Sequence, residues 1–174
     1  MSYKSKKIFI VGTGRCGTVT MSKVFDTMPK MKAIHEGVYY KGGEKKVLGN
    51  LRDINNFIYY QSRGGHDSHY KASINLSGNE ETLDRMSKRF TPRELFIENL
   101  ELKKINFCEA DPYGHCYINF IAKKYPEAKF VHLVRNGYNT CQSWFHRRKN
   151  AYPDELDIKK WHPFALGKPR PLKG

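Results

Sequence analysis

Apolar and polar positions follow two alternating patterns along the chain. Short apolar runs bounded by turn residues are typical of buried strands, and apolar residues three and four positions apart are typical of helices that face a core. The expected strands are residues 7–12, 31–37, 105–110 and 129–134. The expected helices are residues 17–28, 79–90, 136–149, a segment that starts at Thr91, a segment that ends at Pro126, and weaker stretches near 45–60 and 154–161.

The segment TPRE, residues 91–94, carries a signal for a helix start. Thr91 suits the N-cap, Pro92 suits the first helical position, and Glu94 follows Thr91 at the spacing of a capping box. We therefore expect a new helix to begin at Thr91, separate from the helix at 79–90. Among the strands, KFVHLV (129–134) has the clearest pattern of a buried strand.

Strands that alternate with helices predict an α/β fold: a single domain with a central, mostly parallel sheet covered by helices on both faces. In such sheets ligands bind beyond the carboxyl ends of the strands. That rule places four groups on one edge of the sheet. They are residues 12–18, the pair His35-Glu36, residues 109–115 and Arg135.

The formal net charge is +14, from 31 Lys and Arg against 17 Asp and Glu. Such a balance favours anionic partners, which include nucleic acids, acidic glycans and ligands that carry phosphate or sulfate. The basic residues are scattered and form no RNA-binding pattern with Gly and Ser, so we expect no specific nucleic-acid partner. The 39% of hydrophobic residues is typical of a globular protein, and no apolar run predicts a membrane span.

The four cysteines form no CxxC pair, so a zinc ribbon or a thioredoxin motif is not expected. Reduced thiols are typical of the cytosol, and we predict a cytoplasmic protein. The basic N-terminus leads into a short apolar run that enters a glycine turn. We interpret this run as a first strand and not as a signal peptide.

The stretch KIFIVGTGRCGTVTMSKVF (7–25) joins a strand to a helix through a turn with three glycines. Backbone N–H groups of such a loop, together with a helix N-terminus, favour an anion. Gly12 and Gly17 have the spacing of a Walker A loop, but Thr18 stands where its lysine is required. The positively charged residue of this loop is instead Arg15. The alternative is a turn that only links strand to helix.

A second segment, KFVHLVRNGYNTCQSWFHRRK (129–149), places Arg135 at a strand end and Ser143 eight positions later. Eight residues are about two helical turns, so Ser143 can share the side of the helix start. An arginine and a hydroxyl together can bind a second phosphate. The alternative is an arginine that ends a strand and a serine that faces solvent.

Together these two segments resemble the PAPS-dependent sulfotransferases, whose donor is 3′-phosphoadenosine 5′-phosphosulfate. GTGRCGTVTMSKVF is similar to that family's 5′-phosphosulfate loop, and LVRNGYNTCQSW is similar to its 3′-phosphate segment. The likeness is closer to the bacterial, carbohydrate and tyrosyl-protein branches than to the cytosolic phenol and steroid branch. Three positions depart from the usual motifs: Cys16 replaces Ser, Val19 replaces a second hydroxyl, and Gly137 replaces Pro.

The resemblance implies transfer of a sulfuryl group from PAPS, as co-substrate, to a hydroxyl or amine without a metal. It implies that Arg15 stabilises the leaving group and that Arg135 and Ser143 hold the 3′-phosphate. The remaining donor contacts are implied for Gly14, Cys16, Gly17, Thr18 and Val19.

A general base must remove the acceptor's proton. The family resemblance favours Glu36, at the end of the second strand, and His115 is the alternative. His35 is the neighbour of Glu36, and adjacent strand residues point to opposite faces. We therefore expect one of these two side chains to face the site and the other to face the core.

The resemblance also suggests a division of residues 1–174. Residues 5–37 hold the loop and second strand, 38–104 form an acceptor-binding insertion, 105–150 hold the 3′-phosphate segment, and 151–174 form a basic tail. The expected acceptor is a carbohydrate, a phenol or a similar small molecule. Family members usually continue further and complete the adenosine site with a basic, glycine-containing loop. GKPRPLKG (167–174) is a vestige of that loop, a substitute for it, or the point where a longer chain is cut.

Two other functions remain open at this stage. One is a nucleotide or phosphate-ester kinase of the P-loop class, which the missing lysine disfavours. The other is a non-catalytic nucleotide-binding protein with the same fold. The oligomeric state has no signal in the sequence.

Overall fold

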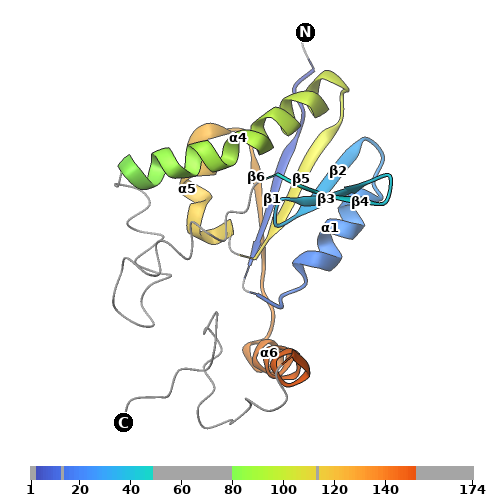
Figure 1. Cartoon of the computed structure of the whole chain (residues 1–174), viewed down its shortest axis with the longest axis vertical. Helices are drawn as coiled ribbons and strands as arrows, with labels where there is room; N and C mark the ends of the chain where they lie inside the picture. The colour runs from blue at the N-terminus through green and yellow to red at the C-terminus, as the bar shows by residue number, and fades with distance from the viewer. Residues whose placement is uncertain (1–2, 13, 49–79, 113, 152–174) are drawn as a thin grey trace. The chain divides into compact units, whose positions relative to one another are not determined.

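The computed structural model describes residues 3–12, 14–48, 80–112 and 114–151 (Figure 1). These residues form two units, one that ends at Leu133 and one that begins at Val134. The second unit contains α6 (Gly137–Ala151). The first unit contains β1 (Lys7–Gly12), α1 (Thr18–Asp26), β2 (Met31–His35), β3 (Val38–Lys41), β4 (Glu44–Val47), α4 (Glu80–Leu102), β5 (Asn106–Asp111), the 3₁₀ helix η2 (Gly114–Tyr117), α5 (Ile118–Lys124) and β6 (Lys129–Leu133).

The first unit is built on a six-stranded sheet in the order β4-β3-β2-β5-β1-β6. Strands β2, β5, β1 and β6 are parallel neighbours. The predicted α/β class with a mostly parallel sheet is therefore confirmed, and all four expected strands are present within two residues of their expected ends. The domain division suggested by the sequence stays a prediction, and the expected helix near 154–161 lies outside the described residues.

The hairpin β3–β4 was not predicted. Lys41 pairs with Glu44 across Gly42 and Gly43, whose φ angles are 59° and 82°. Two positive φ angles define a type I′ turn, which matches the twist of a hairpin and favours glycine. The helix expected near 45–60 is therefore wrong for its described part, residues 45–48. The overlooked signal was the Gly-Gly pair between two short runs.

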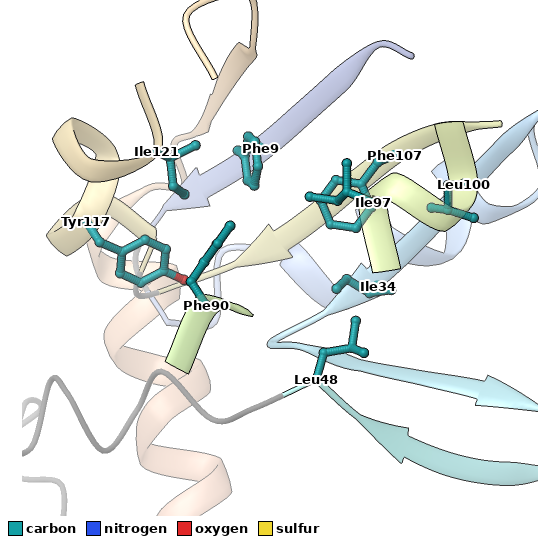
Figure 2. Packing of buried hydrophobic residues seen from close by; sticks show 9 residues of the cluster. All are labelled: Phe9, Ile34, Leu48, Phe90, Ile97, Leu100, Phe107, Tyr117 and Ile121. Atoms are coloured by element: carbon teal, nitrogen blue, oxygen red, sulfur yellow. The ribbon is translucent and has the colours of Figure 1, made fainter. Parts of the chain in front are cut away.

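The sheet separates two apolar layers because side chains alternate along its strands. On one face, Phe9 and Phe107 pack against residues of α4 and α5, as Figure 2 shows. On the other face, Ile10 and Cys108 pack against Met21 and Phe25 of α1. The expectation of helices on both faces is confirmed.

Helix α4 is continuous through Pro92, so the prediction of a separate helix starting at Thr91 is wrong. The buried positions Phe90, Arg93, Ile97 and Leu100 follow a spacing of three and four across the proline. This continuous inner face holds the helix against the sheet on both sides of Pro92, and tertiary packing thereby outweighs the local cost of the proline.

Strand β6 is an edge strand and its residues are exposed or half-buried, so the prediction of a buried strand at 129–134 is wrong. It pairs with β1 alone among the described strands. The central strand is β5, which is buried from Phe107 to Asp111. An uninterrupted apolar run does not reveal which strand lies at the centre, because order in a sheet is set by long-range pairing.

Phe107→Ala should lower the free energy of unfolding by about 3–5 kcal/mol, because Phe107 is fully buried on the central strand and its removal leaves a cavity. Leu102→Ala is the matched control, since Leu102 is 86% exposed at the end of α4. Urea denaturation of both variants measures the difference. Equal losses would show that Phe107 is not part of the core.

Candidate functional site

The loop between β1 and α1 requires glycine at its start. Gly12 is buried, and a Cβ atom there would lie 2.6 Å from Cys16 Sγ and 2.8 Å from the Leu133 carbonyl oxygen. Contacts this short do not occur between real atoms, so any side chain at this position forces the loop or β6 to shift. Gly12 thus fixes how closely the loop passes the end of β6.

The loop ends in a helix start that suits an anion. Gly17 is the N-cap of α1, has a φ of 105°, and makes no side-chain cap hydrogen bond, and the first turn of α1 contains no acidic residue. Arg15 also has a positive φ, 69°, and its side chain is exposed. The positive end of the helix and a guanidinium therefore occur within the same few residues.

Glu36 occupies a tight turn rather than a strand end. His35 pairs with Val38, and the two residues between them, Glu36 and Gly37, have φ angles of 50° and 70°. This is again a type I′ turn, in which asparagine and glycine are preferred. The Glu36 N–H donates to the Ala110 carbonyl at 3.2 Å, which ties the turn to the carboxyl end of β5. A glutamate at positive φ is strained, and such strain concentrates at functional sites.

His35 connects this turn to the glycine loop. Its Nε2 atom lies 3.1 Å from the Thr18 hydroxyl, at the first residue of α1, and 3.9 Å from Glu36 Oε1. Both His35 and Glu36 are partly exposed, at 24% and 21% of their side chains. The prediction that one of them faces the core is therefore wrong, because the left-handed turn at Glu36 breaks the strand alternation. The role of His35 as a link was missed by sequence reasoning.

The third strand end, at β5, is buried. Asp111 is 6% exposed and accepts a hydrogen bond from the Tyr117 hydroxyl. Burial, and then the charge of Asp111, raises the pKa of Tyr117 well above its usual value, so this phenol stays protonated. His115 belongs to η2, but its side chain lies outside the described residues. Its role as an alternative base stays a prediction.

The second unit carries the other two expected binding residues. Asn136 caps α6: its Oδ1 accepts from the Asn139 N–H at 3.3 Å, and its carbonyl accepts from the Thr140 N–H at 3.0 Å. Arg135, just before this cap, is exposed, and Ser143 is half-buried on α6. The expected helix at 136–149 is confirmed, and the 3′-phosphate role of Arg135 and Ser143 stays a prediction.

Cys108 and Cys141 are free thiols, and burial raises the pKa of Cys108 to about 12, which keeps this thiol protonated and unreactive. Within the described ranges, no group of three or more His, Cys, Asp and Glu residues is arranged to hold a metal ion. No helix in the same ranges is long and apolar enough to cross a membrane.

The family model and the similar proteins found by comparison both point to the same family. The sequence pattern of the sulfotransferase family matches residues 7–162. Protein-tyrosine sulfotransferase 1 of Danio rerio is 27% identical over 161 residues, which cover 89% of this chain and 41% of that protein. Protein-tyrosine sulfotransferase 1 of Mus musculus is 25% identical over 163 residues, which cover 89% of this chain and 39% of that protein.

A putative protein-tyrosine sulfotransferase of Caenorhabditis briggsae is 25% identical over 161 residues, which cover 89% of this chain and 50% of that protein. The chain thus spans half or less of the length of these relatives. No solved structure gives a significant match.

Glu36→Asn should raise the free energy of unfolding by about 0.5–1 kcal/mol, because asparagine tolerates the left-handed conformation that strains glutamate. Glu44→Asn is the matched control in the same hairpin region, since Glu44 has no positive φ. Thermal denaturation of both variants measures the effect. A lower melting temperature for Glu36→Asn would mean that the carboxylate, and not strain, dominates the stability of this turn.

Proposed function

The chain belongs to the sulfotransferase family, and on that premise we propose that it transfers the sulfuryl group of PAPS to an acceptor hydroxyl or amine. The observation that carries the proposal is the contact between the glycine loop and the β2–β3 turn. Through His35, the Thr18 hydroxyl and the Glu36 carboxylate are linked over 3.1 and 3.9 Å. A cradle for an anion and a candidate base therefore belong to one cluster.

The residues of the loop fit the sulfonate end of the donor. Gly17 leaves the start of α1 without a side-chain cap, and no carboxylate in the first turn repels an anion. Arg15 adds a permanent positive charge, and a guanidinium can donate two parallel hydrogen bonds to an anionic group. We assign Arg15 to the leaving group, the backbone from Gly14 to Val19 to the phosphosulfate, and Arg135 with Ser143 to the 3′-phosphate.

In the proposed reaction the acceptor's proton passes to the Glu36 carboxylate as the acceptor oxygen or nitrogen forms a bond to sulfur. The bond between sulfur and the bridging oxygen breaks, and its electron pair leaves on 3′,5′-ADP. Arg15 and the N-terminus of α1 stabilise the negative charge that develops there. In-line transfer of this kind requires no metal, because the cationic groups neutralise the leaving group.

We propose the phenolic hydroxyl of a tyrosine as the first acceptor to test, because the relatives are named as protein-tyrosine sulfotransferases. A carbohydrate hydroxyl is the second. The hairpin β3–β4, which follows Glu36 directly, exposes Tyr40 and Lys45 and belongs to the proposed acceptor region, residues 38–104. Residues 49–79 of that region lie outside the described residues. The cytoplasmic location stays a prediction that rests on the cysteines.

We expect 3′,5′-ADP to raise the melting temperature without magnesium and to bind more tightly than 5′-AMP. Arg135→Ala should weaken 3′,5′-ADP binding by about 2 kcal/mol, roughly 30-fold in Kd, and leave 5′-AMP binding unchanged, because the lost bond is charge-assisted. Thermal shift and calorimetry measure both. Arg89→Ala is the matched control, since Arg89 is exposed on α4. Stabilisation by ATP–magnesium alone would favour a kinase and contradict the proposal.

Glu36→Gln should lower turnover by about 10²–10⁴-fold, the usual effect of removing a general base, and leave 3′,5′-ADP affinity intact. Labelled PAPS offered with tyrosine peptides and then with glycans measures the rate. Glu44→Gln, an exposed change in β4, should have no effect. If Glu36→Gln retains the full rate while His115→Ala abolishes it, the base is His115. A wild-type chain that binds 3′,5′-ADP and transfers to none of these acceptors would support the non-catalytic alternative.

A further inference from the structure

A buried ion pair lies beneath the turn that carries Glu36. Arg93 of α4 and Glu109 of β5 have side chains that are 0% and 2% exposed. The Nε–H of Arg93 donates to both carboxylate oxygens of Glu109 at 3.0 Å. The proposed reaction uses neither residue.

The pair belongs to a ring of hydrogen bonds that connects Arg93, Leu48, Gly37 and Glu109. Arg93 Nη1 donates to the Leu48 carbonyl at 2.9 Å, and the Leu48 N–H donates to the Gly37 carbonyl at 2.8 Å. Burial raises the pKa of Glu109, and the charge of Arg93 and a hydrogen bond from the Gly37 backbone N–H act against this rise. Gly37 is therefore held at both of its backbone polar groups, and the ring joins the turn, the end of β4, α4 and β5.

Stability alone does not account for this pair. Burial by itself lowers the pKa of Arg93, but the Glu109 carboxylate raises it above its usual value, so the guanidinium stays charged. Two charges lose their hydration when they are buried, and apolar residues of similar volume often give equal or greater stability. Aromatic side chains lie close by: the Arg93 guanidinium carbon lies 5.9 Å from the centre of the Phe90 ring, and Phe107 shares the same face of the sheet. The buried Asp111 also acts on the pair, because its charge raises the pKa of Arg93.

The turn, in contrast, needs external support. Glu36 and Gly37 are both left-handed, and a strained glutamate persists only where its surroundings over-determine it. Strand β5 supplies two adjacent anchors, because the Ala110 carbonyl accepts from the Glu36 N–H and the Glu109 carboxylate accepts from the next N–H along the chain.

We propose that the Arg93–Glu109 pair is a positioning device that fixes the Glu36–Gly37 turn and thereby directs the Glu36 carboxylate toward His35 and the glycine loop. Arg93 and Glu109 are positioning residues that act through this turn. The inference rests on the proposed function, in which Glu36 is the base. A base displaced by about 1 Å can lose roughly 100-fold in rate, so a support of this kind has a measurable effect.

The test replaces the pair with apolar residues, Arg93→Met with Glu109→Leu, so that neither partner of the pair stays in the core without the other. This double variant should fold, keep its Kd for 3′,5′-ADP and its KM for PAPS, and lose about 10–100-fold in kcat. Glu109→Gln keeps an oxygen that can accept from Gly37, so it should retain more activity than the double variant. That partial rescue distinguishes positioning from general packing.

Lys7→Met is the matched control for loss of a buried ion pair. Lys7 is 3% exposed at the start of β1 and donates to Glu101 at 2.6 Å and to Glu127 at 3.1 Å. Its loss should lower stability and leave kcat unchanged, because Lys7 lies at the opposite end of the strands from the turn.

If the wild-type chain transfers sulfuryl groups and the folded double variant has the same kcat, the inference is overturned. If the wild-type chain shows no transfer, the proposed function has failed, and hydrogen exchange at the Gly37 amide decides the inference instead. Faster exchange in the double variant or in Glu109→Gln than in Lys7→Met supports it, and equal protection overturns it. Glu109→Gln supplies the same comparisons if the double variant does not fold.

Discussion

A buried carboxylate in a largely apolar layer is the constraint around which the first unit is arranged. The alternation of β5 places Glu109 on the same face as Phe107, against α4. A carboxylate in that position needs a cation or hydrogen-bond donors close by, since an isolated buried charge is very costly. Arg93 meets this need from the middle of α4. The helix consequently has to stay regular on both sides of Pro92, with Phe90 before the proline and Arg93 after it fixed to the sheet.

The candidate site depends on backbone conformation as much as on side chains. Gly12 permits the close approach of loop and strand, Gly17 opens the start of α1, and Glu36 projects from a left-handed turn. Gly17 thereby leaves the N-terminus of α1 free of a side-chain cap, and the turn at Glu36 presents its carboxylate. The basic composition of the chain then complements an anionic ligand at this edge of the sheet.

Much of this arrangement follows from the sequence. The strand, glycine loop and helix at residues 7–26 were predictable because their signals are local: a short apolar run, closely spaced glycines and a helical period. The same holds for β2, β5 and α6. The candidate base Glu36 came from the family resemblance, and the structure adds its connection to Thr18 through His35.

The remaining features could not be read in this way because they depend on distant partners. Nothing near Lys129 indicates that β6 lies at the edge, and nothing near Pro92 indicates that packing on Phe90 and Arg93 carries the helix through the proline. The turn at Glu36 is a similar case. Local rules for a strand end predict opposite faces for His35 and Glu36, and only pairing with Val38 and Ala110 shows that the chain has already turned.

The strand order of the sheet also bears on the order in which these parts can assemble during folding. The meander from β2 to β4 joins neighbours through two-residue turns, so its pairing is local and fast to form. The anchors of its first turn, Glu109 and Ala110, lie on a strand made much later in the chain. The residues of the turn are therefore synthesised before the residues that anchor them, and the anchors of Glu36 require β5 to pair with β2.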